Sequence, residues 1–442
     1  MPSRIPQRPP ALKEILSGRG GSKQALILLS RLATVADGVG YLHWDELRRR
    51  QPPEGLSHEH WWLAEKLSRR PAISLPLVGT DGPAFWFCQP PLLLQALHEI
   101  DFKAGASVLA PEVVTSGATR DRYLLSSLME EAITSAQMEG AGTTRDVAKD
   151  MIRSHRPPRD RSERMILNNF RTMQHIRELR GQPLTPELVL DLHRRVCEDT
   201  LPEPSDAGRL RPQEKEVVVE DTYGTVFHVP PPARELEKRL EQLCSFANGD
   251  TPEVFIHPVL RAIILHFWLA YDHPFCDGNG RTARALFYWA MLNQGYWLFK
   301  FISISSAINK ARGQYERSFL FSESDDNDLT YFLLAQLKVI QEAIANLHAY
   351  LGRKADEISA LQRRLEGVVG LNHRQLALLH HALRHAGFRY TVVSHQSSHG
   401  VSLQTARTDL QKLASQGFLL PGKDGRREVF RVPENLAAKL PS

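Results

Sequence analysis

The chain of 442 residues is poor in cysteine and contains no long hydrophobic run. Its four cysteines are widely spaced and form no Cys-x-x-Cys pair, which argues against a disulfide framework or a zinc site and favours a reducing, cytoplasmic compartment. The longest apolar run near the N-terminus, within residues 24–35, is short and interrupted, so we expect neither a signal peptide nor a membrane-spanning helix.

Charge is nearly balanced over the whole chain, with 55 Lys and Arg against 50 Asp and Glu. A hydrophobic content of 42% and a charged content of 24% are typical of a soluble globular protein, and the length predicts two or three domains. From residue 371 onward there are ten Lys and Arg but four Asp and Glu. The positive balance therefore lies in the C-terminal part, which favours an electrostatic partner surface there.

The most informative stretch is HPFCDGNGRTAR, residues 273–284. Its turn Gly278–Gly280 suits conformations with φ > 0 that expose backbone N–H groups, and residues 282–293 contain strong helix formers and no Pro or Gly. Together they predict an anion cradle at a helix N-terminus. Arg281 and Arg284 are three residues apart, so both should project to one side and reach the same polyanion.

Two further side chains in this stretch carry chemistry. Asp277 would repel a bare phosphate, but magnesium is typically held by one or two carboxylates plus substrate phosphate oxygens, so a cation between them explains it. His273 is the proton acceptor available at neutral pH, as a hydroxyl attacking an α-phosphorus requires. An ordinary loop ahead of a surface helix is the alternative, and Cys276 is read as filler. No lysine follows the last glycine, so this is not a Walker A loop.

These twelve residues resemble the signature of the Fic family (filamentation induced by cyclic AMP), HPFx(D/E)GNGRxxR, at every fixed position. The resemblance implies a protein adenylyltransferase that uses ATP and magnesium to transfer AMP to a Ser, Thr or Tyr hydroxyl of a target protein or of itself. It makes His273 the base and Asp277 the magnesium ligand. The implied ATP-binding residues are Phe275, Asp277, Gly278, Asn279, Gly280, Arg281 and Arg284.

Selectivity for the nucleotide is harder to read. Relatives of this family transfer UMP, phosphocholine or a γ-phosphate, but the intact GNGRTAR segment favours the ordinary triphosphate orientation and hence AMP. Trp268 and Tyr315 are candidates to line the adenine pocket, and we include Tyr315 among the ATP-binding residues. A place in the apolar core is the alternative for both.

Residues 121–140 form a second motif. Apolar residues recur there at three- and four-residue spacing, which predicts an amphipathic helix stopped by Gly140. Glu139, in the last turn, opposes the helix dipole unless a cation neutralises it. The segment from Ser135 resembles the Fic-family inhibitory pattern (S/T)xxxE(G/N), which implies that Glu139 pairs with Arg284 and autoinhibits the enzyme. A solvated helix-end charge, or a role in positioning water for removal of AMP, are the alternatives.

Residues 208–232 predict a short β-hairpin in a mostly helical chain. An isolated hairpin leaves an open edge that packs on helices or accepts a peptide as an added strand. It resembles the family's flap, expected over 215–230, which clamps the target segment; a structural connector is the alternative. In the expected pairing Val217, Val218 and Val219 face Thr225, Val226 and Phe227.

The rest of the chain completes a mainly α fold class, a Fic-type helical bundle with a hairpin flap and a C-terminal winged helix-turn-helix. Residues 1–110 resemble the N-terminal extension of some bacterial Fic proteins, and we assign them no chemistry. Residues 111–350 form the expected catalytic core, in which the apolar stretch 257–271 should be the buried helix that delivers His273. Residues 351–369 read as a charged connector. Members of the family often self-associate, so a homodimer is a further expectation.

Residues 370–437 contain a helix, a turn, a second helix and a basic Gly-containing hairpin, the order of a winged helix-turn-helix. Docking of protein, or dimerisation, is the alternative to DNA binding, and a DNA-binding regulator whose core senses nucleotide is the alternative to the enzyme. The histidines at 380, 381, 385, 395 and 399 lack a metal-site pattern. The expected DNA-facing residues are Gln404, Thr405, Arg407 and Thr408 for bases, and Lys423, Arg426 and Arg427 for phosphates.

Overall fold

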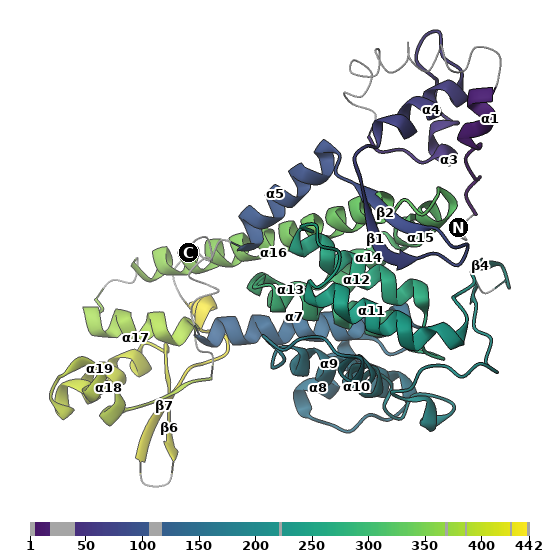
Figure 1. Ribbon diagram of the computed structural model, residues 1–442. Helices are drawn as coiled ribbons and strands as arrows, with labels where there is room; N and C mark the ends of the chain where they lie inside the picture. Colours follow the sequence, from purple (N-terminus) through teal and green to yellow (C-terminus); the bar gives the residue numbers. More distant parts are fainter. Residues whose placement is uncertain are drawn as a thin grey trace. The chain divides into compact units, whose positions relative to one another are not determined.

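The computed structural model describes residues 5–17, 40–105, 117–220, 223–366, 370–384, 387–424 and 427–439 (Figure 1). The chain divides into two compact units. The first consists of residues 1–109 and 122–347, and the second of residues 110–121 and 348–442. The motif of residues 273–284 lies in the first unit, and the basic C-terminal residues lie in the second.

The N-terminal part of the first unit combines short helices with a two-stranded sheet. Its elements are α1 (Leu12–Ser17), α3 (Trp44–Leu47), α4 (His58–Ser68), β1 (Ala72–Val78), β2 (Ala84–Cys88) and α5 (Pro91–Gly105). Ser57 caps α4 by accepting a hydrogen bond from the His60 N–H, as serine does at helix N-termini. Strands β1 and β2 pair antiparallel, and alternate residues of β2, Phe85 and Phe87, are buried.

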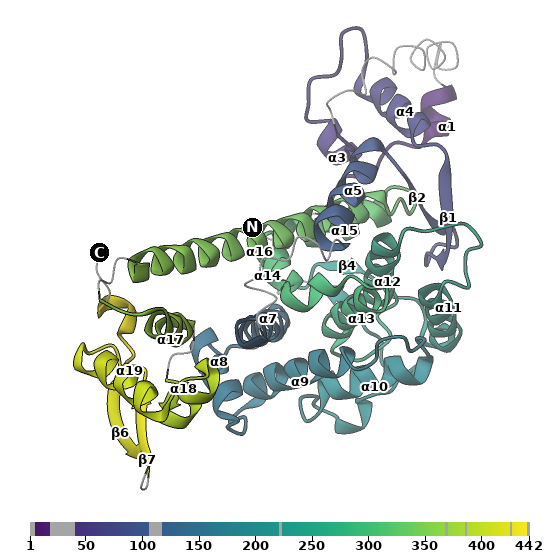
Figure 2. The ribbon, with the colours of Figure 1, turned by 90° about the vertical axis from the view of Figure 1, so that its left-hand side faces the viewer.

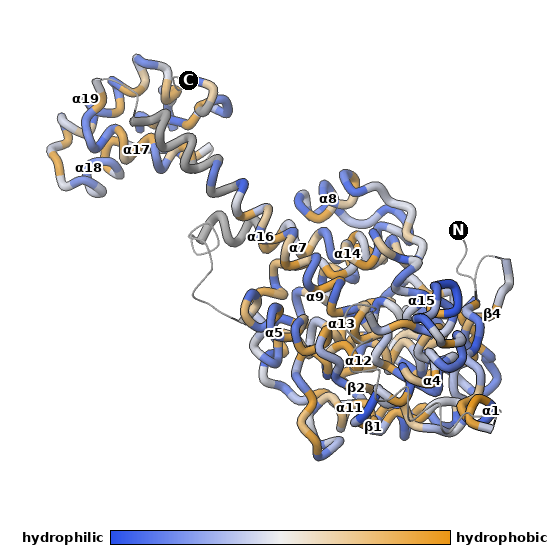
Figure 3. Tube along the Cα trace, turned by 90° about the horizontal axis from the view of Figure 1, so that it is seen from above, coloured by the Kyte–Doolittle hydropathy of each residue, from blue (hydrophilic) through white to orange (hydrophobic). Residues whose placement is uncertain are grey.

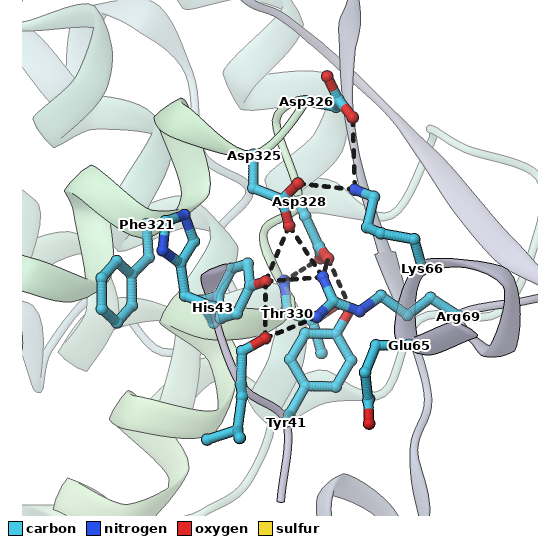
Figure 4. A network of polar contacts seen from close by, with 12 residues as sticks. Tyr41, His43, Glu65, Lys66, Arg69, Phe321, Asp325, Asp326, Asp328 and Thr330 are labelled. Atoms are coloured by element: carbon cyan, nitrogen blue, oxygen red, sulfur yellow. Dashed lines mark hydrogen bonds and ion pairs between the residues drawn. The ribbon is translucent and has the colours of Figure 1, made fainter. Parts of the chain in front are cut away.

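A buried polar network fixes this N-terminal part to the start of α16 (Figure 4). The Nη1 atom of Arg69 donates to Asp325 (2.8 Å), Asp328 (3.0 Å) and the Tyr331 hydroxyl (2.6 Å). Lys66 adds a 2.8 Å bond to Asp325. Loss of one partner would leave an uncompensated buried charge, which typically costs about 3–5 kcal/mol. The region that the sequence left without a role is therefore an integral part of the first unit.

Ten further helices make up the rest of the first unit, and two of them, α7 and α16, extend into the second unit. Among the described residues they are α7 (Gly117–Met138), α8 (Arg145–Ser154), α9 (Arg161–Ile176), α10 (Pro186–Cys197), α11 (Leu236–Asn248), α12 (Pro258–Asp272), α13 (Asn279–Asn293), α14 (Ile304–Lys310), α15 (Arg312–Ser324) and α16 (Thr330–Glu366). Short 3₁₀ turns cover Pro204–Asp206, Ala233–Glu235 and Trp297–Phe301.

Helices α12 and α13 form the centre of this unit. Figure 2 shows them enclosed by α7, α9, α10 and α11, and Figure 3 shows hydrophobic residues gathered along them. Most of α12 between Val259 and Leu269 is buried, as its apolar sequence predicts. Pro258 occupies the first turn, where its missing N–H costs no hydrogen bond. A rigid, buried helix thus leads directly to His273.

The predicted hairpin is present but shorter than expected. Strand β3 (Val219–Glu220) pairs antiparallel with β4 (Val226–His228), and the register shifts by one residue between Val219 and Glu220. The expected strand residues Val217, Val218 and Thr225 lie outside both strands, so that part of the prediction was wrong. The buried side chain of His228, hydrogen-bonded to Glu323 (2.7 Å), fixes β4 to α15. This tertiary anchor, absent from the local pattern, accounts for the observed register.

In its described residues after α16, the second unit contains α17, α18 and α19 and a three-stranded antiparallel sheet with strand order β5-β7-β6. Its elements in chain order are α17 (His373–Arg384), β5 (Arg389–Thr391), α18 (Val392–His399), α19 (Leu403–Ser415), β6 (Leu420–Asp424) and β7 (Arg427–Arg431), followed by a 3₁₀ turn over Leu436–Lys439. Leu379, Leu410, Leu413 and Phe430 are central to its core. The short strand β5 and helix α18 had no counterpart in the sequence-based prediction, which expected only a turn between two helices.

The described part of the chain contains no helix that is both long enough and apolar enough to cross a membrane. All four cysteines are free thiols; Cys88, Cys197 and Cys244 are buried and Cys276 is half-buried. Burial raises the pKa of the Cys197 thiol to about 11, so this side chain is neutral at physiological pH.

Candidate active site

His273 follows the last residue of α12 and adopts a left-handed backbone conformation, with φ 45° and ψ 55°. Its side chain is half-buried. Nδ1 lies 3.3 Å from the carbonyl oxygen of Ala270, which can only accept, so Nδ1 carries the proton and Nε2 keeps a free lone pair. Burial lowers the pKa of His273 to about 4. The imidazole is therefore neutral and able to accept a proton at pH 7.

A buried clamp holds the end of α12 in place. The Asp272 carboxylate accepts two bonds from Arg239, at 2.6 and 2.8 Å, and one from Nε1 of Trp268 at 2.9 Å. Trp268 is fully buried, so it belongs to the core, the alternative that the sequence left open for it. The clamp restrains the backbone from which His273 projects.

The loop after His273 is held by the side chain of Asn279. Its Oδ1 accepts from the Phe275 N–H (2.9 Å) and its Nδ2 donates to the Phe275 carbonyl (2.8 Å). Gly278 is the residue of the expected Gly-Asn-Gly turn that has a positive φ, 82°. Asn279 and Gly280 are instead the first residues of α13, so the helix begins earlier than the sequence suggested.

His193, on α10, supports the same loop and was not found by sequence reasoning. Its Nδ1 accepts from the Gly208 N–H (2.9 Å), so Nε2 carries the proton and donates to the Asp277 carbonyl at 2.9 Å. Its ring stacks on Phe275 with centroids 3.7 Å apart. Burial lowers the pKa of His193 to about 4, which keeps it neutral. Because His193 and Asp277 are 84 positions apart in the chain, no local pattern could have identified it.

The first turn of α13 lies where the sequence predicts an anion cradle. Gly278 is its N-cap and has no side chain with which to satisfy the exposed N–H groups. A Cβ atom at Gly280 would overlap the Glu139 carboxylate, which therefore lies directly against the start of the helix. Negative charge is stabilised at this end of a helix by the helix dipole and the free N–H groups. Glu139 thus occupies the place where an anionic ligand would bind.

Glu139 also forms the ion pair with Arg284 that the inhibitory motif implied. Arg284 Nη2 lies 2.9 Å from Glu139 Oε1, and the same guanidinium donates to Ser135 Oγ (2.9 Å) and to the Ser135 carbonyl (3.0 Å). Burial by itself would raise the pKa of Glu139, but Arg284 outweighs it, aided by Arg281 and His273, and the net pKa lies below the ordinary value. The carboxylate is therefore ionised. Gly140 follows with φ 91°, as expected for a helix stop.

Arg281 lines the same small cavity as Arg284, on the shared helix face that the spacing predicted, but its guanidinium binds a different partner. Its side chain is fully buried and donates to the Val196 carbonyl at 3.0 Å. It therefore binds the C-terminal end of α10, and contact with a polyanion would require it to rearrange. The spacing of the two arginines predicted their shared helix face correctly. It could not predict that a carbonyl group of α10 binds Arg281. Ser135, Arg281 and Arg284 line the same small internal cavity.

Asp277 is the acidic residue of the loop, and its carboxylate is 40% exposed. Oδ1 accepts from the Gly278 N–H (2.5 Å), and Oδ2 lies 3.2 Å from Arg161 on α9. Among the described residues no cluster of three or more His, Cys, Asp or Glu could hold a metal by itself. A single accessible carboxylate fits magnesium, which keeps waters and substrate phosphates as its other ligands. Arg161, a further residue that sequence reasoning missed, would compete with such a cation.

Tyr315, on α15, is half-buried beside Arg284. Its hydroxyl lies 3.0 Å from Nε2 of His266 on α12. Burial raises the pKa of Tyr315 to about 12, although the Arg284 charge opposes this shift. Burial lowers the pKa of His266 to about 3. Both rings are therefore neutral, and Tyr315 remains a candidate for contact with a nucleotide.

A pocket of about 320 Å³ lies along β4. Four consecutive residues of the hairpin, Val226–Val229, contribute to it, together with Tyr271 from the last turn of α12. His228 is bound there between the Tyr271 carbonyl (2.6 Å) and Glu323, and although burial opposes protonation, Glu323 raises its pKa. The pocket therefore links the hairpin to the helix that carries His273. Ile5, Arg8, Thr80 and Asp81 complete its wall.

The expected DNA-facing residues all belong to the second unit. Ser402 caps α19 by accepting a hydrogen bond from the Thr405 N–H. Thr405 therefore lies in the first turn of α19, as predicted. Gln404, Arg407 and Thr408 on α19, and Lys423 and Arg427 on the hairpin, are exposed. Arg407 Nε lies 3.8 Å from Glu428, a weak contact. Arg426 and His385 lie outside the described residues.

Comparison with known proteins defines the class to which this site belongs. Residues 183–291, which include the loop and both arginines, match the Fic/DOC family model. A Fic family protein from Desulfovibrio desulfuricans G20 is similar in fold, with a TM-score of 0.53 at 18% identity over 78% of this chain and 97% of that one. Residues 183–291 are thus a domain of the Fic type.

Two curated relatives are similar to this region in sequence. Protein adenylyltransferase Fic of Nematostella vectensis is 35% identical over 117 residues, or 26% of this chain and 25% of the relative. Protein adenylyltransferase fic-1 of Caenorhabditis elegans is 35% identical over 108 residues, or 24% of this chain and 19% of the relative. The chain therefore spans a quarter or less of the length of these relatives. The similarity supports a Fic-type transferase.

Proposed function

We propose that this protein transfers AMP from ATP to a hydroxyl side chain of a protein, and that Glu139 restrains this activity. One observation carries the proposal. A carboxylate rests on the anion-binding start of α13 and pairs with Arg284, while a neutral imidazole with a free Nε2 stands at the end of the preceding helix. A triphosphate would use the cradle that Glu139 occupies.

The reaction follows from these positions. His273 Nε2 takes the proton of the target hydroxyl, and the hydroxyl oxygen forms a bond to the α-phosphorus of ATP. The bond from that phosphorus to the oxygen bridging to the β-phosphorus breaks, and pyrophosphate leaves. Asp277 would hold magnesium, which neutralises charge on the phosphates. The first-turn N–H groups of α13 bind phosphate oxygens and require no reorganisation during the reaction.

The target segment has a place beside the hairpin. In the described two-stranded sheet, β4 (Val226–His228) pairs on one side with β3, and its other edge can accept a peptide beside the pocket of about 320 Å³, which Tyr271 also lines. An extended peptide can add to such an edge through main-chain hydrogen bonds, with side chains entering the pocket. This mode supports the flap role proposed for the hairpin, and it makes few demands on the sequence of the target.

Labelled ATP tests the proposed function. We expect Glu139→Gly to raise incorporation of label from α-labelled ATP into the protein itself or into proteins of a cell extract, and His273→Ala to abolish it in either background. Gln137→Gly is the comparison variant: it weakens the same helix end and removes the hydrogen bond from Gln137 to the Thr143 carbonyl, but keeps both side chains of the ion pair. Unchanged labelling in the Glu139 variant would remove the inhibition hypothesis. Loss of label from an already modified protein would instead favour the alternative, removal of AMP.

For the second unit we propose a winged helix that binds DNA. Its support is the order of its elements, its excess of Lys and Arg, and the exposed residues Arg407 on α19 and Lys423 on the hairpin. We expect a DNA mobility shift that weakens as salt rises and weakens further in Arg407→Ala and Lys423→Ala. A shift that these substitutions leave unchanged would exclude this face. Protein docking through the same unit is the alternative.

A further inference from the structure

Glu131, a buried carboxylate on α7, lies two turns before Glu139 and lines the same small cavity as Ser135 and Arg284. It is 2% exposed. Its oxygens accept hydrogen bonds from the Tyr288 hydroxyl (2.9 Å), Ser303 Oγ (3.0 Å), and the N–H (2.9 Å) and Oγ (2.5 Å) of Ser305. The Tyr288 hydroxyl shares its one proton between Glu131 and the Ile302 carbonyl, which lies 3.0 Å away. Four donors from α13 and the start of α14 therefore converge on one charge of α7. Such an arrangement fixes the helix at this point, because a displaced carboxylate would lose several charge-assisted bonds together.

The contacts between α7 and α13 follow one register. Three pairs of residues make them: Glu131 with Tyr288, Ser135 with Arg284, and Glu139 with Gly280. Each step of four residues forward along α7 corresponds to a step of four backward along α13. Residues four apart lie about one turn, or roughly 6 Å, along the same helix face. The first contact therefore sets where the last one falls.

We propose that Glu131 is a positioning residue, which sets the register of α7 so that Glu139 is held on the start of α13, and that loosening Glu131 relieves the inhibition. This inference rests on the proposed role of Glu139. One nearby contact supports a fixed α7: Ser127 Oγ, one turn before Glu131, donates to the Phe301 carbonyl at 2.8 Å. The Tyr288 hydroxyl that faces Glu131 is itself held by the Ile304 N–H at 2.8 Å.

The sign of the effect separates this role from a purely structural one. If Glu131 only stabilised the fold, its loss would lower both ATP binding and activity. If it positions Glu139, its loss should raise both. A shift of α7 by about one ångström would lengthen the 2.9 Å contact between Glu139 and Arg284 beyond hydrogen-bond range. The anion cradle would then be open to ATP for a larger fraction of the time.

The test uses the full chain and two substitutions of the first contact, Glu131→Gln and Tyr288→Phe. Glu130→Gln is the matched control, because it removes a carboxylate one residue earlier on α7. Glu130 lies on a different face of that helix and pairs with Lys149 of α8 (2.5 Å). Calorimetry measures the Kd for ATP with magnesium, and α-labelled ATP measures transfer. For Glu131→Gln we expect about tenfold tighter ATP binding, the effect of one lost hydrogen bond, and higher labelling. We expect a smaller gain for Tyr288→Phe and no gain for the control.

In a Glu139→Gly background, Glu131→Gln should add nothing, because the residue that it positions is gone. Unchanged or weaker ATP binding in Glu131→Gln alone would overturn the inference. An equal gain in affinity from Glu131→Gln in the Glu139→Gly background would overturn it as well. A Glu139→Gly protein that transfers no label would refute the proposed function, and calorimetry alone would then decide on Glu131. Thermal melts identify a misfolded Glu131→Gln protein, in which case Tyr288→Phe, which removes one hydroxyl, decides.

Discussion

Replacement of Glu139 by glycine should tighten ATP binding and change stability in two opposite ways. In the wild-type protein ATP must first displace Glu139 from Arg284, a charge-assisted hydrogen bond of 2.9 Å. Such a bond contributes about 1.5–3 kcal/mol, which corresponds to about 10- to 100-fold in affinity. The glycine variant needs no such displacement, so its Kd for ATP with magnesium should be lower by about that factor.

The same substitution should destabilise the protein when no nucleotide is bound. Arg284 is 3% exposed and would lose one partner, but Ser135 keeps two contacts to it and the Glu139 side chain is 27% exposed. We therefore expect a loss of about 1–2 kcal/mol, less than for a fully buried pair. Ligand at 100 times its Kd stabilises the native state by about 2.7 kcal/mol, so saturating ATP should more than reverse the loss.

Thermal melts of both proteins with and without ATP and magnesium measure these effects, and calorimetry measures the two Kd values. The expected pattern is a lower melting temperature for Glu139→Gly alone and a larger rise on adding ATP than in the wild type. Glu139→Gln, which keeps the size but removes the charge, should give most of the gain in affinity. Equal affinities for all three proteins would refute the reasoning, because Glu139 would then not compete with a phosphate.

Three further predictions concern the cradle and its proton acceptor. Gly280→Ala should abolish ATP binding even in the Glu139→Gly background, because the alanine Cβ would fill the position of the Glu139 carboxylate. ATP binding that persists in calorimetry would contradict this prediction. Asp277→Asn should raise the magnesium concentration for half-maximal labelling about tenfold, and an unchanged magnesium titration would exclude this ligand. The kcat/KM of the activated enzyme should be flat above about pH 5 and fall toward pH 4 as His273 becomes protonated; a fall centred near pH 6.5 would contradict a buried base.

A fourth prediction concerns stability and pH. The pKa of His193 is about 4 in the folded protein against 6.5 for the unperturbed group. Between these values the unfolded state binds more protons, so stability is complete above about pH 6.5 and is lost as the pH falls toward 4. At pH 5 the loss attributable to His193 should be about 2 kcal/mol. Urea titrations of wild type and His193→Asn at pH 7 and pH 5 measure it, and equal pH dependence would contradict the assignment.

The central helices could be predicted from the sequence because their pattern is local. The apolar run 257–271 corresponds to α12 (Pro258–Asp272), and the expected helix 121–140 corresponds to α7, which begins at Gly117 and ends at Met138. The glycine motif located a helix start close to the observed one, and the inhibitory pattern anticipated the contact between Glu139 and Arg284. In each of these cases the decisive information is the spacing of neighbouring residues.

Features that depend on residues far apart in the chain could not be predicted. Arg161 and His193 reach Asp277 from α9 and α10, and Arg281 turns to the Val196 carbonyl, although no short pattern connects these segments. The hairpin register follows from the burial of His228 and not from β-propensity. The N-terminal part gave no chemical signal because its polar residues act through partners on α15 and α16.

The central claim is that the α-phosphate of ATP, and not the γ-phosphate, is transferred. Parallel reactions of Glu139→Gly with α-labelled and with γ-labelled ATP, followed by gel electrophoresis, test it most directly. We predict labelled protein from α-labelled ATP and none from γ-labelled ATP, with the signal lost in the Glu139→Gly, His273→Ala double variant. Label from γ-labelled ATP, or from α-labelled ATP at equal intensity without His273, would contradict the account.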